Sequence, residues 1–173
     1  MPELKPEAAG ASLLFLREEQ IRQAQDMLFL AWRDFAAAAD PLLAEHGLGR
    51  AHHRALHFIG RNPGLTVTDL MSILCVTKQS LSRVLTALVA GGLVAQSTGR
   101  EDRRQRRLHL TPAGAALERS LFDRQREKLL SAYREAGGPA VDGFRRVLRG
   151  IMGKAARHTL DAQDAIPHTR RAV

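Results

Sequence analysis

The stretch from Leu65 to Thr111 constrains the fold of this chain more than any other part of it. In this stretch, apolar residues at helical spacing are followed by two strand-like runs with a cluster of arginines between them. The strand-like runs cover residues 93–98 and 107–111, and Gly91 and Gly92 stop the helix before them. This order predicts two short helices, a hairpin and a strongly charged hairpin tip.

The two predicted helices are separated by a short turn. The first begins at Thr66, an N-cap residue, and Asp69 three residues later resembles a capping box. The second helix is capped by Thr77 and reaches Ala90. Its apolar residues fall at i, i+3, i+4 and i+7 and form one buried stripe: Leu81, Val84, Leu85 and Leu88.

The opposite face of the second helix carries no acidic residue, whereas an ordinary surface helix mixes both charges. It offers a cation, an amide and hydroxyls, which are the groups that read base edges in the major groove or bind phosphates. Arg83 can pair with guanine and Gln79 with adenine. We therefore expect a DNA-recognition helix with six contact residues: Thr77, Lys78, Gln79, Ser80, Ser82 and Arg83. The alternative is that this face is an ordinary solvated polar surface.

The hairpin tip holds five arginines within eight residues: Arg100, Arg103, Arg104, Arg106 and Arg107. Like charges at this density repel one another unless an anion lies among them, and polymeric phosphate is the obvious candidate. We expect Arg103 and Arg104 to enter the minor groove beside the recognition helix. Arg106 and Arg107 are expected to face phosphates, and Asp102 to brace an arginine by an ion pair. The alternative is a cluster that only increases solubility.

The charge of the whole chain also favours nucleic acid as the partner. Its 173 residues carry a net charge of +8, and residues 78–107 alone hold seven Lys or Arg against two acids, a net of +5. A membrane surface usually requires a basic amphipathic helix with bulky apolar anchors, and no apolar run approaches the ~20 residues that span a bilayer. The amino terminus is a poor signal peptide, so we expect a single cytoplasmic domain with no membrane partner.

Long helical segments flank this region and predict a mainly α fold with a small β-hairpin. Residues 17–38 show helical apolar spacing. Thr111 and Pro112 open a long helix that runs to about Glu135, and Gly137-Gly138-Pro139 precede one last helix. Residues 50–111 would form the DNA-binding lobe. A lone lobe needs no such flanks, so segments 17–38 and 112–160 are expected to associate with a partner.

The central pattern resembles the winged helix-turn-helix of the MarR family of bacterial regulators. VTKQSLSRVLTALVAGGLV is similar to the family's recognition helix and its glycine stop, and GRAHHRALHFIGRNPGLTV and VTKQSL are similar to the PetP-like subgroup. The resemblance covers about residues 17–160. Five residues match the family's wing pattern in register: Asp102, Arg104, Leu108, Leu110 and Thr111.

The resemblance implies a transcriptional regulator that binds double-stranded DNA as a homodimer. The helices in residues 17–38 and 112–160 of two subunits would interlock, and two-fold symmetry predicts half-sites ~10 base pairs apart. Repression is the expected default action. No nucleophile–base pair, glycine-rich phosphate loop or paired carboxylates point to an enzyme. A non-specific architectural or RNA-binding protein is the remaining alternative.

Members of this family also commonly release DNA on binding a small-molecule effector, which the resemblance suggests for this chain. Candidate pocket residues are Trp32, His52, His53 and His57. His53 and His57 are four residues apart, a spacing that metals or haem iron can use. No complete ligand set is evident, so no metal or cofactor is expected, and a metal- or haem-responsive regulator is kept as an alternative. Trp32 is expected mainly in the core or at the dimer interface.

The single cysteine, Cys75, excludes an intramolecular disulfide and a multi-cysteine zinc site. We expect Cys75 to be a small residue buried between Leu74 and Val76. The alternative is a reactive thiol, because the amino terminus of the following helix lowers a thiol pKa. Cysteine-sensing relatives carry their reactive residue near the first helix, where this chain has none.

Overall fold

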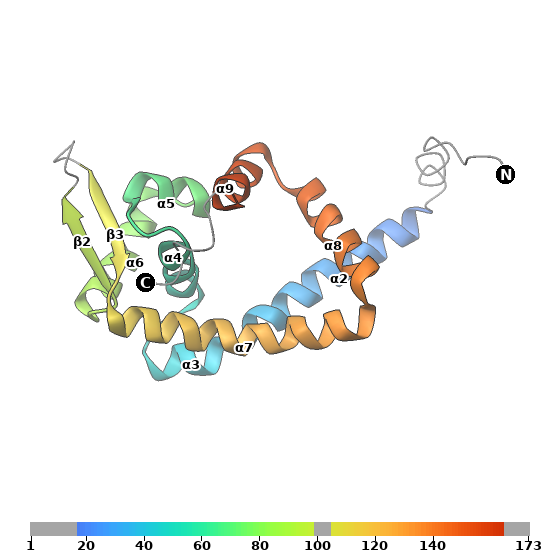
Figure 1. Cartoon of the computed structure of the whole chain (residues 1–173), viewed down its shortest axis with the longest axis horizontal. Helices are drawn as coiled ribbons and strands as arrows, with labels where there is room; N and C mark the ends of the chain where they lie inside the picture. The colour runs from blue at the N-terminus through green and yellow to red at the C-terminus, as the bar shows by residue number, and fades with distance from the viewer. Residues whose placement is uncertain (1–16, 99–104, 165–173) are drawn as a thin grey trace. The chain divides into compact units, whose positions relative to one another are not determined.

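The computed structural model describes residues 17–98 and 105–164 (Figure 1). The chain forms two compact units, one that ends at Ala37 and one that begins at Ala38. The first contains helix α2 (Glu18–Ala37). The second contains, in chain order, α3 (Asp40–Glu45), α4 (Arg50–Arg61), β1 (Leu65–Thr66), α5 (Val67–Leu74), α6 (Lys78–Ala90), β2 (Val94–Thr98), β3 (Arg106–Leu110), α7 (Pro112–Ala136), α8 (Gly138–Ile151) and α9 (Lys154–Asp164). The predicted mainly helical fold with a small β-hairpin is confirmed.

Helices α4, α5 and α6 enclose the apolar core of the second unit. Ala55, Leu56 and Ile59 are fully buried, as the spacing in α4 requires. Helix α6 buries Leu81, Leu85 and Leu88 of the predicted stripe, while Val84 is half-buried. Each buried leucine stabilises the fold by about 1.5–3 kcal/mol, so this packing holds α6 with its polar side outward.

The caps that the sequence predicted for α5 and α6 are present. Thr66 Oγ1 accepts the backbone N–H of Asp69 at 3.1 Å, and the Asp69 carboxylate accepts the N–H of Thr66 at 3.3 Å. Thr77 Oγ1 accepts the N–H of Ser80 at 3.3 Å at the start of α6. These bonds satisfy amides that have no partner inside the helix, and they fix where each helix begins.

The sheet has the strand order β1-β3-β2, and all its strands are antiparallel. Strands β2 and β3 form the predicted hairpin, with Ser97 opposite Arg107 and Thr98 opposite Arg106. The short strand β1 was not expected, because Leu65 follows a turn and Thr66 reads as a helix cap. Its pairing with β3 joins residues far apart in the sequence, which local patterns do not report.

A tight joint connects the end of α6, the hairpin and the start of α7. Thr111 Oγ1 donates to the Gly92 carbonyl at 2.6 Å, and the Thr111 N–H donates to the Leu93 carbonyl at 3.0 Å. Gly114 lies so close that a Cβ there would stand 1.9 Å from the Leu93 oxygen. Glycine is therefore the residue that this approach accepts.

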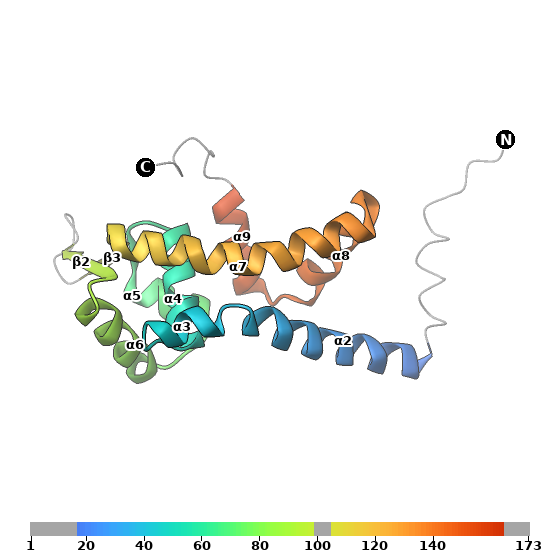
Figure 2. The ribbon, with the colours of Figure 1, turned by 90° about the horizontal axis from the view of Figure 1, so that it is seen from below.

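The last helix expected from the sequence is two helices in the structure. Helix α8 ends at Ile151, and Met152, with ψ of 139°, is extended rather than helical. The Arg157 side chain donates to the Met152 carbonyl at 2.8 Å and braces the corner. Helix α9 then returns and packs against α5. Both views show α7 leading away from the sheet, with α8 at its far end (Figures 1 and 2).

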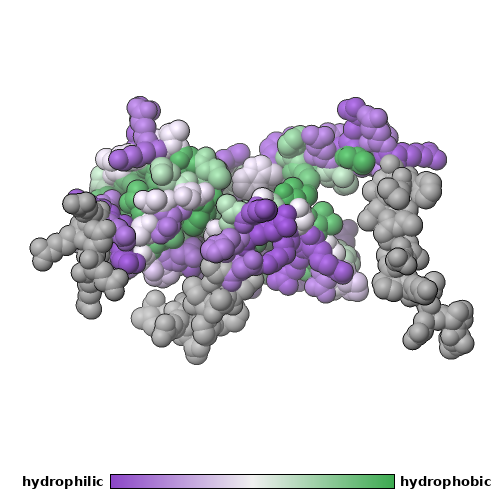
Figure 3. Space-filling view, turned by 90° about the horizontal axis from the view of Figure 1, so that it is seen from above, coloured by the Kyte–Doolittle hydropathy of each residue, from purple (hydrophilic) through white to green (hydrophobic). Residues whose placement is uncertain are grey.

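Large apolar side chains come to the surface outside the core, among hydrophilic neighbours (Figure 3). On α7 and α8 the exposed apolar residues are Phe122, Leu129, Phe144, Val147 and Ile151, and on α2 they are Ile21, Met27, Leu28, Phe29, Leu30 and Trp32. Within the described ranges, no single helix has the length and apolar character to cross a bilayer. Helices α5 and α6 reach that threshold only together, across a bend of 116°.

Candidate nucleic-acid interface

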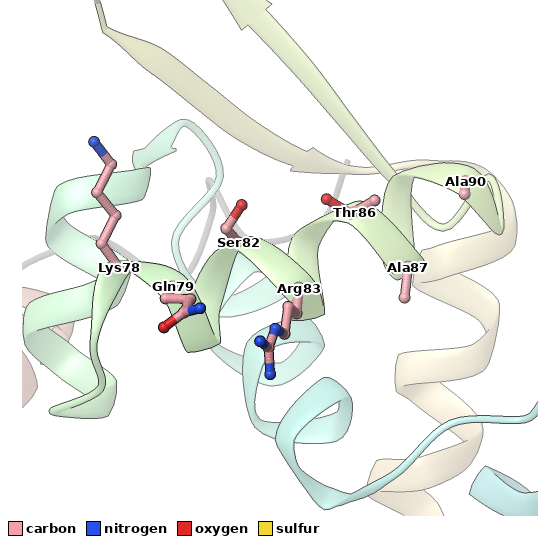
Figure 4. Close-up of a pocket in the computed structure, with 7 residues that line it drawn as sticks. All are labelled: Lys78, Gln79, Ser82, Arg83, Thr86, Ala87 and Ala90. Carbon is pink, nitrogen blue, oxygen red and sulfur yellow. The ribbon is translucent and has the colours of Figure 1, made fainter.

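The exposed side of α6 forms an open groove, which we call the α6 polar face: Lys78, Gln79, Ser82, Arg83 and Thr86, with Ala87 and Ala90. Figure 4 shows Gln79 and Arg83 extending to one side of the helix and Ser82 and Lys78 to the other. Polar side chains thus extend from both sides of α6, and the small residues Ala87 and Ala90 lie toward its carboxyl end. A base edge or a sugar–phosphate strand can approach such a surface closely.

Three members of this surface were absent from the predicted contacts: Thr86, Ala87 and Ala90. Thr86 continues the helical spacing of Gln79 and Arg83, so the sequence held a signal for it. The two alanines carry no chemistry that a sequence pattern singles out. Their contribution is small size, which becomes visible only when the helix is seen with its neighbours.

The amino terminus of α6 adds a positive end to this face. Its first turn contains no acidic residue, and Lys78 is its first residue. Thr77 and Ser80 hydroxyls bond each other at 3.0 Å, so both are held at the helix start. The helix dipole favours an anion at such a position.

The cations near α6 lack the carboxylate partners that several arginines on other helices have. Arg22 pairs with Glu18, Arg50 with Asp40, Arg119 with Asp123, and Arg149 with Asp161. Among the described residues, Lys78, Arg83 and Arg106 have no carboxylate within ion-pair distance. Their charge therefore remains available to an external anion.

The described part of the wing is formed by β2 and β3. Arg106 and Arg107 are adjacent on β3, so their side chains leave opposite faces of the sheet. Arg107 Nη1 donates to the Gly64 carbonyl at 3.3 Å. The other expected wing residues lie outside the described residues: Arg100, Asp102, Arg103 and Arg104.

The expected histidine cluster is divided among different local roles. His52 Nδ1 accepts the N–H of Gly49 at 3.0 Å and helps to begin α4. His57 Nδ1 lies 3.5 Å from the Glu118 carboxylate on α7. Burial lowers the pKa of His53, and His57 lowers it further, while Glu118 and Asp40 act in the opposite direction.

This arrangement does not assemble a metal centre from the histidines. Across residues 17–98 and 105–164, no group of three or more His, Cys, Asp or Glu side chains is placed to hold a metal ion. Trp32 lies on α2, is 58% exposed and has its ring centroid 6.1 Å from that of Phe35. It is not buried in the core of its unit.

The expectation that Cys75 is buried was wrong. Cys75 is exposed and ends α5 in the left-handed conformation, with φ of 51° and ψ of 46°. The turn between α5 and α6 requires this conformation, which turns the side chain out of the apolar core. Its thiol donates to the Ser72 carbonyl at 3.5 Å.

The chain is similar in sequence to known proteins. A model of the MarR family matches residues 46–105. The HTH-type transcriptional regulator PetP of Rhodobacter capsulatus is 55% identical over 148 residues, which cover 86% of this chain and 89% of the relative.

Two solved structures share the fold at low sequence identity. NadR in complex with 4-hydroxyphenylacetate is 20% identical, with a TM-score of 0.65, covering 87% of this chain and 97% of that one. The MarR C80S mutant from E. coli, complexed with operator DNA, is 19% identical, with a TM-score of 0.62, covering 78% and 96%.

Proposed function

Because the chain belongs to the MarR family of DNA-binding transcriptional regulators, we propose that it recognises a particular promoter sequence as a homodimer and represses transcription there. The observation that carries the proposal is the α6 polar face. It combines cations without carboxylate partners among the described residues, an amide and hydroxyls on one exposed surface. Such a surface suits the major groove, where base edges present distinct donors and acceptors.

Within the α6 polar face, Arg83 and Gln79 are proposed to read bases. Their side chains extend to the same side of α6 (Figure 4), so they can address neighbouring base pairs. Arg83 would donate two hydrogen bonds to a guanine, and Gln79 would pair with an adenine. Ser82 and Lys78 would hold the backbone, together with Thr77 and Ser80 at the helix start.

The wing is proposed to contact the groove beside α6. Arg103 and Arg104 would enter the minor groove, Arg106 would face phosphates, and Asp102 would brace an arginine. Each phosphate contact makes the slope of log affinity against log salt concentration more negative by about 0.9. Binding by this protein should therefore weaken steeply as the salt concentration rises.

The exposed apolar residues support a homodimer. Phe144, Val147 and Ile151 on α8 are 42%, 60% and 62% exposed, and α2 exposes Phe29 and others. Leaving this much apolar surface in water is unfavourable, and a second copy of the chain offers the same surface in return. Repression would follow from occupation of the promoter by the bound dimer.

We also propose that binding of a small molecule releases the protein from DNA. NadR, which shares the fold, was solved with 4-hydroxyphenylacetate bound. In this chain, His53 and His57 are half-buried on α4, and His57 lies beside Glu118 of α7. These two histidines would line the effector site together with His52. The neutral form that the lowered pKa of His53 favours can both donate and accept a hydrogen bond.

Selection of bound duplexes from a random-sequence pool tests the proposal. The selected sequence should be an imperfect palindrome with half-sites ~10 base pairs apart. Arg83→Ala should reduce the preference for this duplex over a scrambled one by about 1–3 kcal/mol. Arg119→Ala removes an exposed arginine that pairs with Asp123, and it serves as the control that leaves the preference unchanged.

Two outcomes would contradict the proposal. Equal affinity for the selected and scrambled duplexes would instead indicate a non-specific architectural protein. A monomer that binds no duplex in dilute buffer would exclude both the homodimer and DNA binding. Protection of the whole selected site by a single bound dimer is the expected footprint.

A further inference from the structure

Arg107 differs from Arg106, the other described arginine of the wing, because its side chain donates a hydrogen bond to another segment of the protein. It lies on β3, the central strand, opposite Thr66 of β1 on one side and Ser97 of β2 on the other. Its Nη1 donates to the Gly64 carbonyl at 3.3 Å. Arg106 leaves the opposite face of β3 and makes no such bond within the part of the chain that the structure describes.

Gly64 occupies the turn that leads into the helix-turn-helix. Its φ of +85° is one that residues with a side chain rarely adopt. Its N–H donates to the Leu108 carbonyl on β3 at 3.0 Å. Both polar backbone groups of Gly64 therefore bond to β3, one to its main chain and one to the Arg107 side chain.

The position of this turn gives the bond a consequence for DNA binding. Thr66, which caps α5, follows Gly64 by two residues. Leu70 of α5 and Leu81 of α6 belong to the same apolar core, so the turn and the DNA-recognition helix are joined through that core. A bond from β3 to Gly64 thus fastens the central strand of the wing to the helices that carry the α6 polar face.

We propose that Arg107 is a positioning residue for DNA binding, whose guanidinium fixes the angle between the wing and the helix-turn-helix. This role replaces the phosphate contact expected from the sequence. It rests on the proposed function, since the angle matters to binding only if α6 and the wing contact the same duplex. A fixed angle sets both parts in register before DNA arrives, so less conformational freedom is lost on binding.

Hydrogen exchange in the free protein tests the fastening without DNA. Arg107→Met keeps the length of the side chain and removes its donors, and Arg106→Met is the matched control on the other face. Losing one exposed hydrogen bond should speed exchange of the Gly64 amide by about 2- to 12-fold in Arg107→Met. Arg106→Met should leave it unchanged, and Arg107→Lys, which retains a donor, should restore protection.

DNA affinity then tests the functional part of the inference. The probes are a duplex selected by the wild-type protein from a random pool and a scrambled duplex of the same composition. Arg107→Met should lose about 2- to 12-fold more affinity for the selected duplex than for the scrambled one. Arg106→Met, as the loss of a phosphate contact, should weaken both duplexes equally.

Unchanged exchange of the Gly64 amide in Arg107→Met would overturn the inference. Equal loss of affinity for both duplexes, as in Arg106→Met, would also overturn it and restore the phosphate contact. If the wild-type protein itself shows no preference between duplexes, the proposed function fails. The exchange experiment would then still decide whether Arg107 fastens the turn.

Discussion

Replacing Gly114 with alanine should destabilise the protein, although alanine favours helices more than glycine does. The added Cβ would stand 1.9 Å from the Leu93 oxygen and 2.8 Å from its carbonyl carbon. Both are backbone atoms, so the start of α7 must move away from Leu93, which lies between α6 and β2. This movement also strains the bond from the Thr111 N–H to the Leu93 oxygen, 3.0 Å long in the structure.

The balance of these effects gives the magnitude. Overpacking costs about 1–3 kcal/mol, and a weakened hydrogen bond costs about 0.5–1.5 kcal/mol more. The helix preference of alanine offsets about 1 kcal/mol at most, because Gly114 lies in the first turn of α7. We expect the free energy of unfolding to fall by about 1–3 kcal/mol.

Urea unfolding followed by circular dichroism measures this change, at one protein concentration because association alters apparent stability. The matched control is Gly150→Ala in α8, where a Cβ meets no atom within 4 Å. It should be neutral or stabilising by up to ~1 kcal/mol. At Gly60 the Cβ would meet the tip of Leu110 at 2.9 Å, and a flexible side chain can yield, so a smaller loss is expected. A Gly114→Ala protein as stable as Gly150→Ala would refute the reasoning.

Two further predictions concern other positions. Cys75→Gly should raise the free energy of unfolding by about 0.5–1 kcal/mol. A left-handed conformation costs residues other than glycine about 1–2 kcal/mol, and the larger entropy that glycine loses on folding offsets part of this gain. A lower urea midpoint for Cys75→Gly would argue against the prediction. The lowered pKa of His53 means that the folded protein binds its proton less readily than the unfolded chain, whose pKa is about 6.5. His53 should therefore contribute stability above about pH 6.5, and this stability is lost as the pH falls through the lowered pKa. His53→Gln should flatten the decline in melting temperature between about pH 8 and 5. An unaltered decline would assign the effect to other titrating groups.

The features that the sequence predicted well are those decided by neighbours along the chain. The cap at Thr77 and the stripe from Leu81 to Leu88 depend on spacings within one helix, and both are present. The same local spacing exposes Gln79 and Arg83, since burying one side of a helix turns the other outward. For this reason most of the α6 polar face could be listed before its structure was known.

The features that the sequence missed depend on contacts between distant segments or on an unusual backbone angle. Strand β1 exists because Leu65 pairs with Leu108, and α9 is separate from α8 because it packs against α5. The conformation of Cys75 is set by the turn between two helices, so its apolar neighbours gave a misleading indication of burial. The bond of Arg107 to Gly64 joins residues 43 positions apart, and a run of arginines does not reveal which one has an internal partner.

The return of α9 to α5 has a consequence for how motion travels through the second unit. Helix α5 is tied to α7 through the sheet and the core, and again through α8 and α9. A displacement at the distant end of α7 would therefore reach α5 by two parallel routes. A change that loosens one route alone would leave α5 held by the other.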